Sequence, residues 1–312
     1  MKTDRPLLGI LLMIGFCVVA PMGDAVAKLL GEKQPLGQLL LIRFAVQALL
    51  LAPLVALTGR SWRLSGHLLN LAILRTFLHI IGIGMMFTAL RYLPLADAVA
   101  IAFVMPFILL VLGRHFLGEE VGIRRLLACV VGFIGTLLVI QPSFVEVGLP
   151  ALLPLGVALN FAVFILVTRK LAPHTDPIGL QTTSGLIAVI VLLPLILLLQ
   201  PFDFALTDFV AVDRHNAFLL FAIGALGTLG HLLMTWSLRY APSATLAPIQ
   251  YLEIPVATII GFLIFKDWPN GLAALGILIT MAAGLYVVMR ERAIARAQPQ
   301  AQEQPPTIPP EA

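Results

Sequence analysis

The sequence predicts an all-α polytopic membrane protein, with ten transmembrane helices arranged as two inverted five-helix repeats. The membrane is indicated by composition, because 60% of the 312 residues are hydrophobic and only 12% are charged. Soluble domains are about half apolar and about a quarter charged, so an ordinary soluble protein is excluded. The repeat is indicated by a stretch at Leu90–Phe116 that recurs within Leu238–Trp268.

Ten apolar runs remain when the chain is divided at its charges, prolines and glycines. Each run is about long enough to cross a hydrocarbon core of roughly 30 Å as a helix. The predicted spans are Leu7–Leu30, Leu36–Leu57, Leu68–Leu90, Leu95–Gly113, Gly122–Ile140, Leu149–Leu171, Ile178–Leu199, Asn216–Leu238, Ser243–Phe265 and Gly271–Met289.

Lysine and arginine are distributed unequally between the two sides of this predicted topology. If the N-terminus is cytoplasmic, the inner side receives Lys2, Arg5, Arg60, Arg63, Arg75, Arg114, Arg124, Arg125, Arg169, Lys170, Arg239, Arg290, Arg292 and Arg296. The outer side receives only Lys28, Lys33, Arg91, Arg214 and Lys266. Cytoplasmic loops retain basic residues, so we expect both termini to be cytoplasmic. The same asymmetry accounts for the net charge of +4, and no nucleic-acid partner is expected.

The two copies of the repeat correspond residue by residue. Several residues 148 positions apart are identical in the two copies. Arg91-Tyr92 corresponds to Arg239-Tyr240, Pro94 to Pro242 and Ala96 to Ala244. Each copy contains an odd number of crossings, so the second must enter the membrane upside down. The predicted repeats are residues 1–142 and 143–292, followed by a disordered cytoplasmic tail at 293–312 that is rich in Gln and Pro. Inverted repeats are typical of secondary transporters, which bind substrate near the midplane.

Glu253 is the main candidate for a functional residue, and the first copy has Met105 in its place. In the predicted ninth helix it lies roughly 15 Å from either membrane surface, at 1.5 Å of rise per residue. A charge at that depth costs about 3 kcal/mol or more, and usually faces a cavity and has a function. The alternative is that Glu253 only holds two helices together.

Two neighbours extend this predicted polar site along the same helix. Gln250 lies three residues before Glu253, on the same face. Pro255 lacks the N–H that would bond to the Tyr251 carbonyl, which we therefore expect to be bare. The Ala244 carbonyl is predicted to be bare for the same reason, because of Pro248.

Two histidines are predicted on similar faces of equivalent helices. His231 aligns with Ile83, and His79 lies one turn before that position. They either bind substrate or relay protons, or they are buried structural histidines.

Arg43 lies one-third of the way into the second predicted helix. It either snorkels outward or holds an anionic group or Glu253. Asp24 and Lys28 have the spacing of a salt bridge within one helix, which is the interpretation favoured here.

Three uncharged side chains complete the candidates. Asn160 either lines the cavity or makes a hydrogen bond between helices. Phe103 and Trp236 either form stacking walls or pack in the membrane core. No phosphate-binding glycine loop, metal-ligand spacing or nucleophile motif is present, so neither a cofactor nor ATP coupling is expected. An intramembrane enzyme would need converging carboxylates or a His-Asp pair, and the sequence indicates only one central carboxylate.

Several motifs resemble those of the drug/metabolite transporter superfamily, EamA type. They are LRY-x-P-x-A at the start of the fourth and ninth helices, Phe-Leu-Gly-Glu119-Glu120 after the fourth, and GFIGTLLVIQP at the end of the first repeat. The resemblance implies alternating access around a central cavity, lined chiefly by the third, fourth, eighth and ninth helices. At the end of the second copy, Lys266-Asp267 replaces the usual Gly-Glu or Asn-Glu.

The expected function is secondary-active transport of a small polar organic metabolite across the bacterial cytoplasmic membrane. The stretch ATLAPIQYLEIPVATIIGFLIFKDWP is similar to members that move riboflavin or S-adenosylmethionine. A riboflavin-type vitamin is favoured, and amino acids or their derivatives are the alternative. A structural or lipid-handling membrane protein is a third possibility. The expected partners are the substrate, the lipid bilayer and a coupling proton or ion, with the chain acting as a monomer or homodimer.

Overall fold

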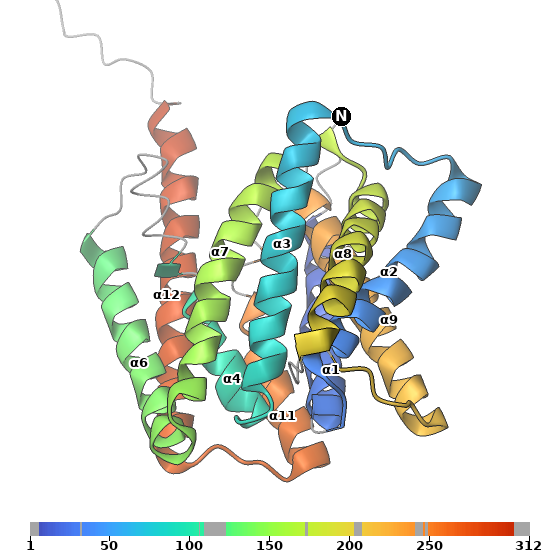
Figure 1. The fold of residues 1–312 in the computed structure, drawn as a ribbon. Helices are drawn as coiled ribbons and strands as arrows, with labels where there is room; N and C mark the ends of the chain where they lie inside the picture. Colours follow the sequence, from blue (N-terminus) through green and yellow to red (C-terminus); the bar gives the residue numbers. More distant parts are fainter. Residues whose placement is uncertain are drawn as a thin grey trace, which may run out of the picture.

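The computed structural model describes residues 6–31, 33–105, 107–108, 123–171, 174–202, 208–240, 246 and 249–302. All regular elements in these ranges are helical (Figure 1). The helices are α1 (Pro6–Gly31), α2 (Leu36–Thr58), α3 (Gly66–Ala89), α4 (Leu95–Ala102), α6 (Ile123–Val147), α7 (Leu153–Leu171), α8 (Pro177–Leu199), α9 (Arg214–Tyr240), α11 (Glu253–Phe265) and α12 (Gly271–Gln302). Two short 3-10 turns, η1 (Leu149–Leu152) and η3 (Gln200–Phe202), precede α7 and follow α8.

The helices have the length and composition of membrane spans. Among the described residues, 7 are long and apolar enough to cross a bilayer: Leu7–Gly31, Leu36–Thr58, Gly66–Ala89, Val130–Val147, Leu149–Thr168, Pro177–Phe202 and Arg214–Ser237. Glu253–Phe265 and Gly271–Tyr286 are apolar but shorter. Many large apolar side chains are exposed, including Leu7 and Leu57, as expected for a surface that faces lipid. The prediction of an all-helical, multi-pass membrane protein is confirmed.

The predicted fourth and ninth spans are not single helices. In the predicted fourth span, α4 ends at Ala102 and the chain turns at Phe103-Val104. In the predicted ninth span, a turn at Tyr251-Leu252 separates Gln250 from α11. The Tyr251 carbonyl accepts a hydrogen bond from the Ile254 N–H at 3.3 Å, so the prediction that Pro255 leaves this carbonyl bare is wrong. Ala244 and Pro248 lie outside the described residues.

Two helices extend well beyond their predicted ends, whereas the ends of α1, α2 and α9 differ from the predicted ones by at most two residues. α6 continues to Val147, past the predicted end at Ile140. α12 continues to Gln302, so residues 293–302 of the predicted tail are helical. Residues 303–312 lie outside the described ranges.

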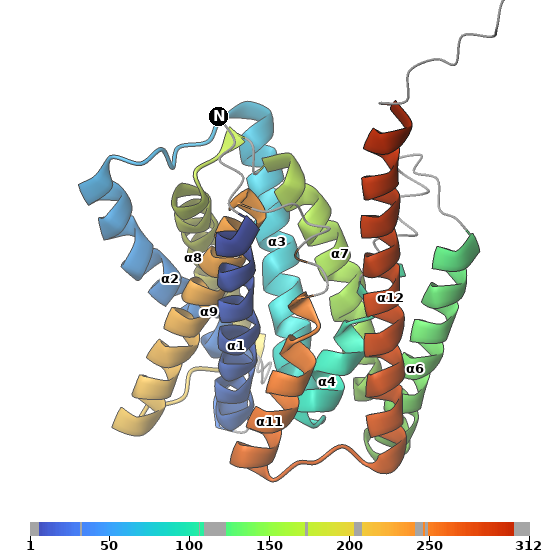
Figure 2. The same ribbon diagram turned by 180° about the vertical axis from the view of Figure 1, so that it is seen from behind.

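Four helix pairs make the most extensive contacts in the bundle. α1 packs against α9, α3 against α7, α2 against α8 and α6 against α12 (Figures 1 and 2). α2 also packs against α9, and α11 packs against α1 and α4. Glycines allow the closest approaches. A Cβ atom on Gly135 of α6 would lie 2.9 Å from the carbonyl oxygen of Gly276 on α12, and one on Gly224 of α9 would meet Val46 of α2. The start of α1 and the end of α12 lie at the same end of the bundle (Figure 2).

Candidate functional site

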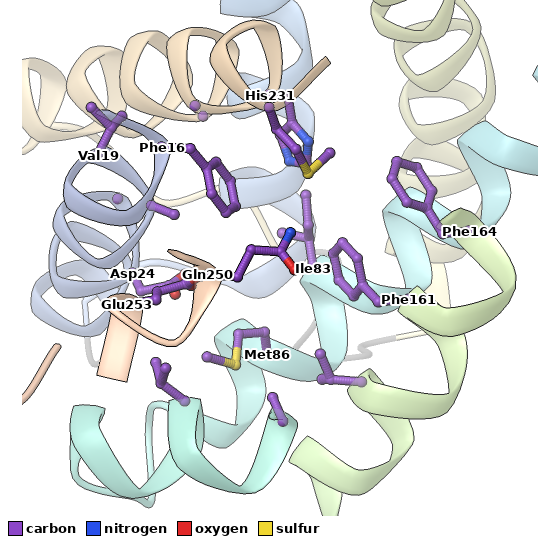
Figure 3. A pocket seen from close by; sticks show the side chains of 18 of the residues that line it. Phe16, Val19, Asp24, Ile83, Met86, Phe161, Phe164, His231, Gln250 and Glu253 are labelled. Atoms are coloured by element: carbon purple, nitrogen blue, oxygen red, sulfur yellow. The ribbon is translucent and has the colours of Figure 1, made fainter. Parts of the chain in front are cut away.

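A cavity opens between α1, α2, α3, α4, α7, α9 and the turn that precedes α11 (Figure 3). Its empty volume is about 1130 Å³ with the open mouth included. Most of the wall is apolar, with five phenylalanines and three methionines: Phe16, Phe87, Phe103, Phe161, Phe164, Met86, Met105 and Met234. The titratable and amide side chains in the wall are Asp24, Arg43, His231, Gln250 and Glu253.

Glu253 reaches the cavity from the first turn of α11. This is a position at which the backbone N–H groups of a helix favour a negative charge. Gln250 lies on the other side of the turn and also faces the cavity (Figure 3). The interruption of the helix therefore places an amide and a carboxylate together in the cavity wall.

Asp24 of α1 is a second carboxylate in the same wall, beside Glu253 (Figure 3). Its charge interacts with that of Glu253 and with that of Arg43. The predicted salt bridge between Asp24 and Lys28 is wrong. Lys28 Nζ instead donates to Asp267 Oδ2 at 2.8 Å and to the Leu93 carbonyl at 3.0 Å.

Arg43 is only 3% exposed, so the interpretation in which it snorkels to the surface is wrong. Its guanidinium stacks on Phe44, 4.7 Å from the ring centroid, and lies against Gly227 of α9. Among the described residues, its Nη1 has no hydrogen-bond partner. The cavity wall therefore contains, within the described part of the chain, a cationic side chain with one unpaired donor, together with the carboxylates of Asp24 and Glu253.

The two predicted histidines meet. His79 Nε2 lies 2.9 Å from His231 Nε2, and the rings are nearly perpendicular, with centroids 4.2 Å apart. His231 lines the cavity, whereas His79 is fully buried behind it, between the rings of Phe44 and Phe164. This pair joins α3 to α9.

Of the other predicted site residues, one lines the cavity and three make contacts within the bundle. Phe103 lines the cavity, and the Tyr251 ring packs beside it with centroids 5.3 Å apart. Tyr251 itself is 2% exposed and is not part of the wall. Trp236 packs against an apolar cluster around Leu232, away from the cavity. Asn160 of α7 donates to the Leu78 carbonyl of α3 at 2.7 Å. Of the two predicted alternatives for Asn160, the structure therefore shows the hydrogen bond between helices.

Sequence reasoning also missed a buried charge at Arg75. We counted it with the inner loops, but it lies inside α3 and is 0% exposed. Its guanidinium donates to Thr168 Oγ1 and Ser184 Oγ, both at 3.0 Å, and stacks on Phe164. Its position seven residues inside the predicted span Leu68–Leu90 was the signal for this burial.

No group of three or more His, Cys, Asp or Glu side chains that could hold a metal ion occurs within the described part of the chain.

When the sequence is compared with models of protein families, the model of one family matches two successive parts of the chain. The EamA-like transporter family matches residues 7–141 and again residues 148–290. Together the matches cover most of the chain.

Curated relatives with transport functions cover most of the chain at low identity. A riboflavin transporter of Vibrio cholerae serotype O1 is 26% identical over 262 residues, covering 83% of this chain and 84% of the relative. An S-adenosylmethionine uptake transporter of Rickettsia prowazekii is 23% identical over 275 residues, covering 88% and 90%. A pseudopaline exporter of Pseudomonas aeruginosa is 24% identical over 292 residues, covering 93% and 96%.

A solved crystal structure of a protein is among those that share the fold. It has a TM-score of 0.59 and 15% sequence identity, and the similarity covers 93% of this chain and 99% of that chain.

Proposed function

The chain belongs to the EamA-like transporter family, and we propose that it is a secondary-active carrier of a small polar organic metabolite in the bacterial cytoplasmic membrane. The observation that carries this proposal is the placement of Asp24, Arg43 and Glu253 in one cavity of an apolar bundle. Charges inside a membrane protein are expensive, and they mark substrate or ion pathways.

Alternating access by two inverted five-helix repeats, residues 1–142 and 143–292, is supported by the packing. Exchange of the two copies converts the α1–α9 pair into the α7–α3 pair, and both pairs are present. The helix interruptions at Phe103-Val104 and Tyr251-Leu252 are also separated by the repeat offset of 148. Interrupted helices commonly form the substrate site of such carriers. The full count of ten crossings is part of this proposal.

Cytoplasmic placement of both termini belongs to the same proposal. It is supported by the basic residues of the predicted inner loops and by the common end of the bundle at which α1 starts and α12 ends (Figure 2).

The charges in the cavity change which substrate is favoured. Aromatic walls suit a planar vitamin such as riboflavin, which the sequence favoured. The structure adds Asp24, so that one guanidinium and two carboxylates line the same cavity. A molecule with a cationic and an anionic group complements this set better than an uncharged ring, because each buried charge then has a partner. We therefore place an amino-acid derivative such as S-adenosylmethionine first and riboflavin second. The carboxylates are also where we expect a coupling proton or ion to bind.

The test is uptake of labelled S-adenosylmethionine and labelled riboflavin by purified protein in proteoliposomes, with and without an imposed pH gradient. Asp24→Asn and Glu253→Gln should each lower S-adenosylmethionine uptake by about tenfold or more, as expected when a charged hydrogen-bond partner is lost. Glu146→Gln is the control, because it makes the same chemical change at an exposed position on α6.

Three outcomes would contradict the proposal at different levels. Uptake of riboflavin alone would reverse the order of substrates. Full uptake by the well-folded Glu253→Gln variant would remove Glu253 from the site. Uptake of neither compound at any gradient, in either direction, would favour a structural or lipid-handling protein.

A further inference from the structure

We propose that Arg75 and Ser184 form a second anion-binding subsite, covered by the Phe164 ring, which receives the carboxylate of the substrate after that group leaves Arg43. The transfer between the two arginines rests on the proposed function. The subsite itself does not, because it is an arrangement of buried donors that can be probed with any small anion.

Arg75 is a buried cation whose partners among the described residues are uncharged. It is 0% exposed, and its guanidinium makes two hydrogen bonds, both to hydroxyls and both at 3.0 Å: Nε to Thr168 Oγ1 and Nη1 to Ser184 Oγ. Hydroxyls accept these hydrogen bonds but do not neutralise the charge. A charge inside a membrane protein without an opposite charge is costly, and such residues mark substrate or ion pathways. An anion is the group that would complete this cluster.

Two donors of the cluster lack an acceptor within the described part of the chain. Arg75 Nη2 has no hydrogen-bond partner there. The Ser184 hydroxyl accepts from Arg75, and its own hydrogen has no acceptor in the same part of the chain. Thr168 differs, because its hydroxyl already donates to the Phe164 carbonyl at 2.7 Å. A carboxylate has two acceptor oxygens, so it can bind both unpaired donors.

The Phe164 ring contacts both Arg75 and the cavity. Phe164 belongs to the cavity wall (Figure 3), and Arg75 Cζ lies 4.5 Å from the centroid of its ring. Arg75 does not line the cavity, and the ring itself is fully buried. The ring is therefore the cover of the subsite, and its rotation brings the guanidinium to the cavity wall.

Arg43 and Arg75 lie at the two ends of one row of rings. Arg43 stacks on Phe44, 4.7 Å from its centroid, and the Phe44 and His79 centroids are 5.2 Å apart. His79 in turn packs on Phe164 at 5.1 Å, and Phe164 packs on Arg75. Arg43 lines the cavity. The row therefore connects a cation in the cavity wall to a cation behind it.

The two arginines also lie at different depths in the bundle. Arg43 lies in the first third of α2, which begins where α1 ends. Arg75 lies near the start of α3, about two turns before Ile83 of the cavity wall. The start of α3 is at the end of the bundle where α1 starts and α12 ends (Figures 1 and 2). A carboxylate that passes from Arg43 to Arg75 therefore moves toward the side that the proposed function assigns to the cytoplasm.

The subsite can be probed without any substrate, by thiol reagents of opposite charge. Ser184→Cys is made in protein whose 2 native cysteines are replaced by alanine, and its reaction with a sulfonate and with a trimethylammonium methanethiosulfonate is timed in proteoliposomes. We expect the sulfonate to react faster. Arg75→Gln should lower the ratio of the two rates by about tenfold, because the attraction of a buried cation is lost. The control is Ala20→Cys in the α1 part of the cavity wall, where Arg75→Gln should leave the ratio nearly unchanged.

Phe164→Leu tests the cover, and it keeps both hydroxyl partners of Arg75. It should speed the reaction of Ser184→Cys with the sulfonate reagent severalfold. If Ser184→Cys reacts with neither reagent, even in Phe164→Leu protein, no subsite opens there and the proposal is overturned. An unchanged rate ratio in folded Arg75→Gln protein would overturn it as well, because Arg75 would then attract no anion.

The transfer step is tested by uptake of S-adenosylmethionine and of its decarboxylated analogue, which differ only in the carboxylate. Arg75→Gln should lower the maximal rate for S-adenosylmethionine by about tenfold, as expected for a lost charged hydrogen bond, with little change in KM because Arg43 still binds the carboxylate on entry. Uptake of the analogue should be nearly unaffected. Arg75→Lys keeps the charge and should restore part of the loss.

Two transport results separate this step from the proposed function. Equal losses for the two compounds in Arg75→Gln protein would give Arg75 a packing role and overturn the transfer. Uptake of neither compound by the unmodified protein would count against the proposed substrate, and the rate ratios at Ser184→Cys would still decide whether the anion subsite exists.

Discussion

Phe103 and Tyr251 stand at the two helix interruptions, and their ring centroids lie 5.3 Å apart. Each residue comes directly after the last helical residues of its segment, and the two positions are one repeat offset apart. The contact therefore joins the two interruptions. It lies at the turn from which Gln250 and Glu253 face the cavity.

Gly284→Ala should disturb this contact. A Cβ atom at position 284 of α12 would overlap the hydroxyl and ring of Tyr251, so the ring must move. We expect a loss of about 1–3 kcal/mol of stability from overpacking and a clear fall in transport. The control is Gly271→Ala on the same helix, where the added Cβ has no atom within 4 Å. Thermal unfolding in detergent measures both variants, and equal melting temperatures would contradict the prediction.

Gly227→Ala should weaken substrate binding without weakening the fold. The new Cβ would lie 2.9 Å from Arg43 Nη2 and 3.0 Å from its Nε, which displaces the guanidinium. Alanine is also the better helix former by about 1 kcal/mol, so α9 itself should not be destabilised. We expect KM to rise by about tenfold, the equivalent of one charged hydrogen bond. In the control Gly84→Ala, the nearest atom to the Cβ is Leu40 Cδ1 at 3.5 Å, an ordinary contact. A similar KM in both variants would show that the position of Arg43 is unimportant.

Thr168→Val should destabilise the protein because it removes an acceptor from a buried cation. Arg75 Nε donates to Thr168 Oγ1 at 3.0 Å, and Arg75 is 0% exposed. The loss should be about 1.5–3 kcal/mol, as for hydrogen bonds to charged groups. The control is Thr136→Val, because the Thr136 hydroxyl is also buried and donates to a carbonyl of its own helix, that of Gly132, with no other hydrogen bond among the described residues. Both variants are compared by chemical or thermal unfolding. If Thr136→Val costs as much, Arg75 does not depend on Thr168.

The ion pair between Lys28 and Asp267 should have a larger coupling energy than the pair between Arg60 and Asp176. The first pair has side-chain exposures of 19% and 33%, and Lys28 also bonds to the Leu93 carbonyl. The second has exposures of 41% and 20%. Double-mutant cycles with Lys28→Met and Asp267→Asn should give about 1 kcal/mol or more, against about 0.5 kcal/mol for Arg60→Met and Asp176→Asn. Equal couplings, or couplings with the same dependence on salt, would contradict this ranking.

The helical class and most helix positions could be predicted from the sequence because lipid imposes a simple rule. A backbone in hydrocarbon must satisfy its own hydrogen bonds, so long apolar runs such as Leu36–Leu57 become helices with few alternatives. The interruption at Tyr251-Leu252 follows no such rule. Pro255 removes one donor, but a continuous kinked helix and a turn in which Tyr251 bonds to Ile254 are both compatible with the sequence.

The site was only partly predictable because its members are brought together by tertiary packing. Glu253 was identified from the cost of burying charge, which depends on position along one helix. For Arg43 the sequence left two interpretations, and the one in which it snorkels to the surface is wrong. Asp24 was assigned to Lys28 by a rule for neighbours on one helix, whereas Lys28 reaches Asp267 after α11. That choice depends on how α1 packs against α11, which is not determined by local spacing.

The close approach of Gly135 and Gly276 has a mechanical consequence for a carrier. Two backbones in direct contact cannot separate without opening a void. If the protein works by the alternating access proposed above, we therefore expect the α6–α12 contact to be the pivot about which the other helices rotate. This contact lies at one edge of the bundle, and α2 and α9 lie toward the opposite edge (Figure 1). Displacement grows with distance from a pivot. A small rotation at these two glycines would therefore displace α2 and α9 the most, and these helices carry Arg43 and His231.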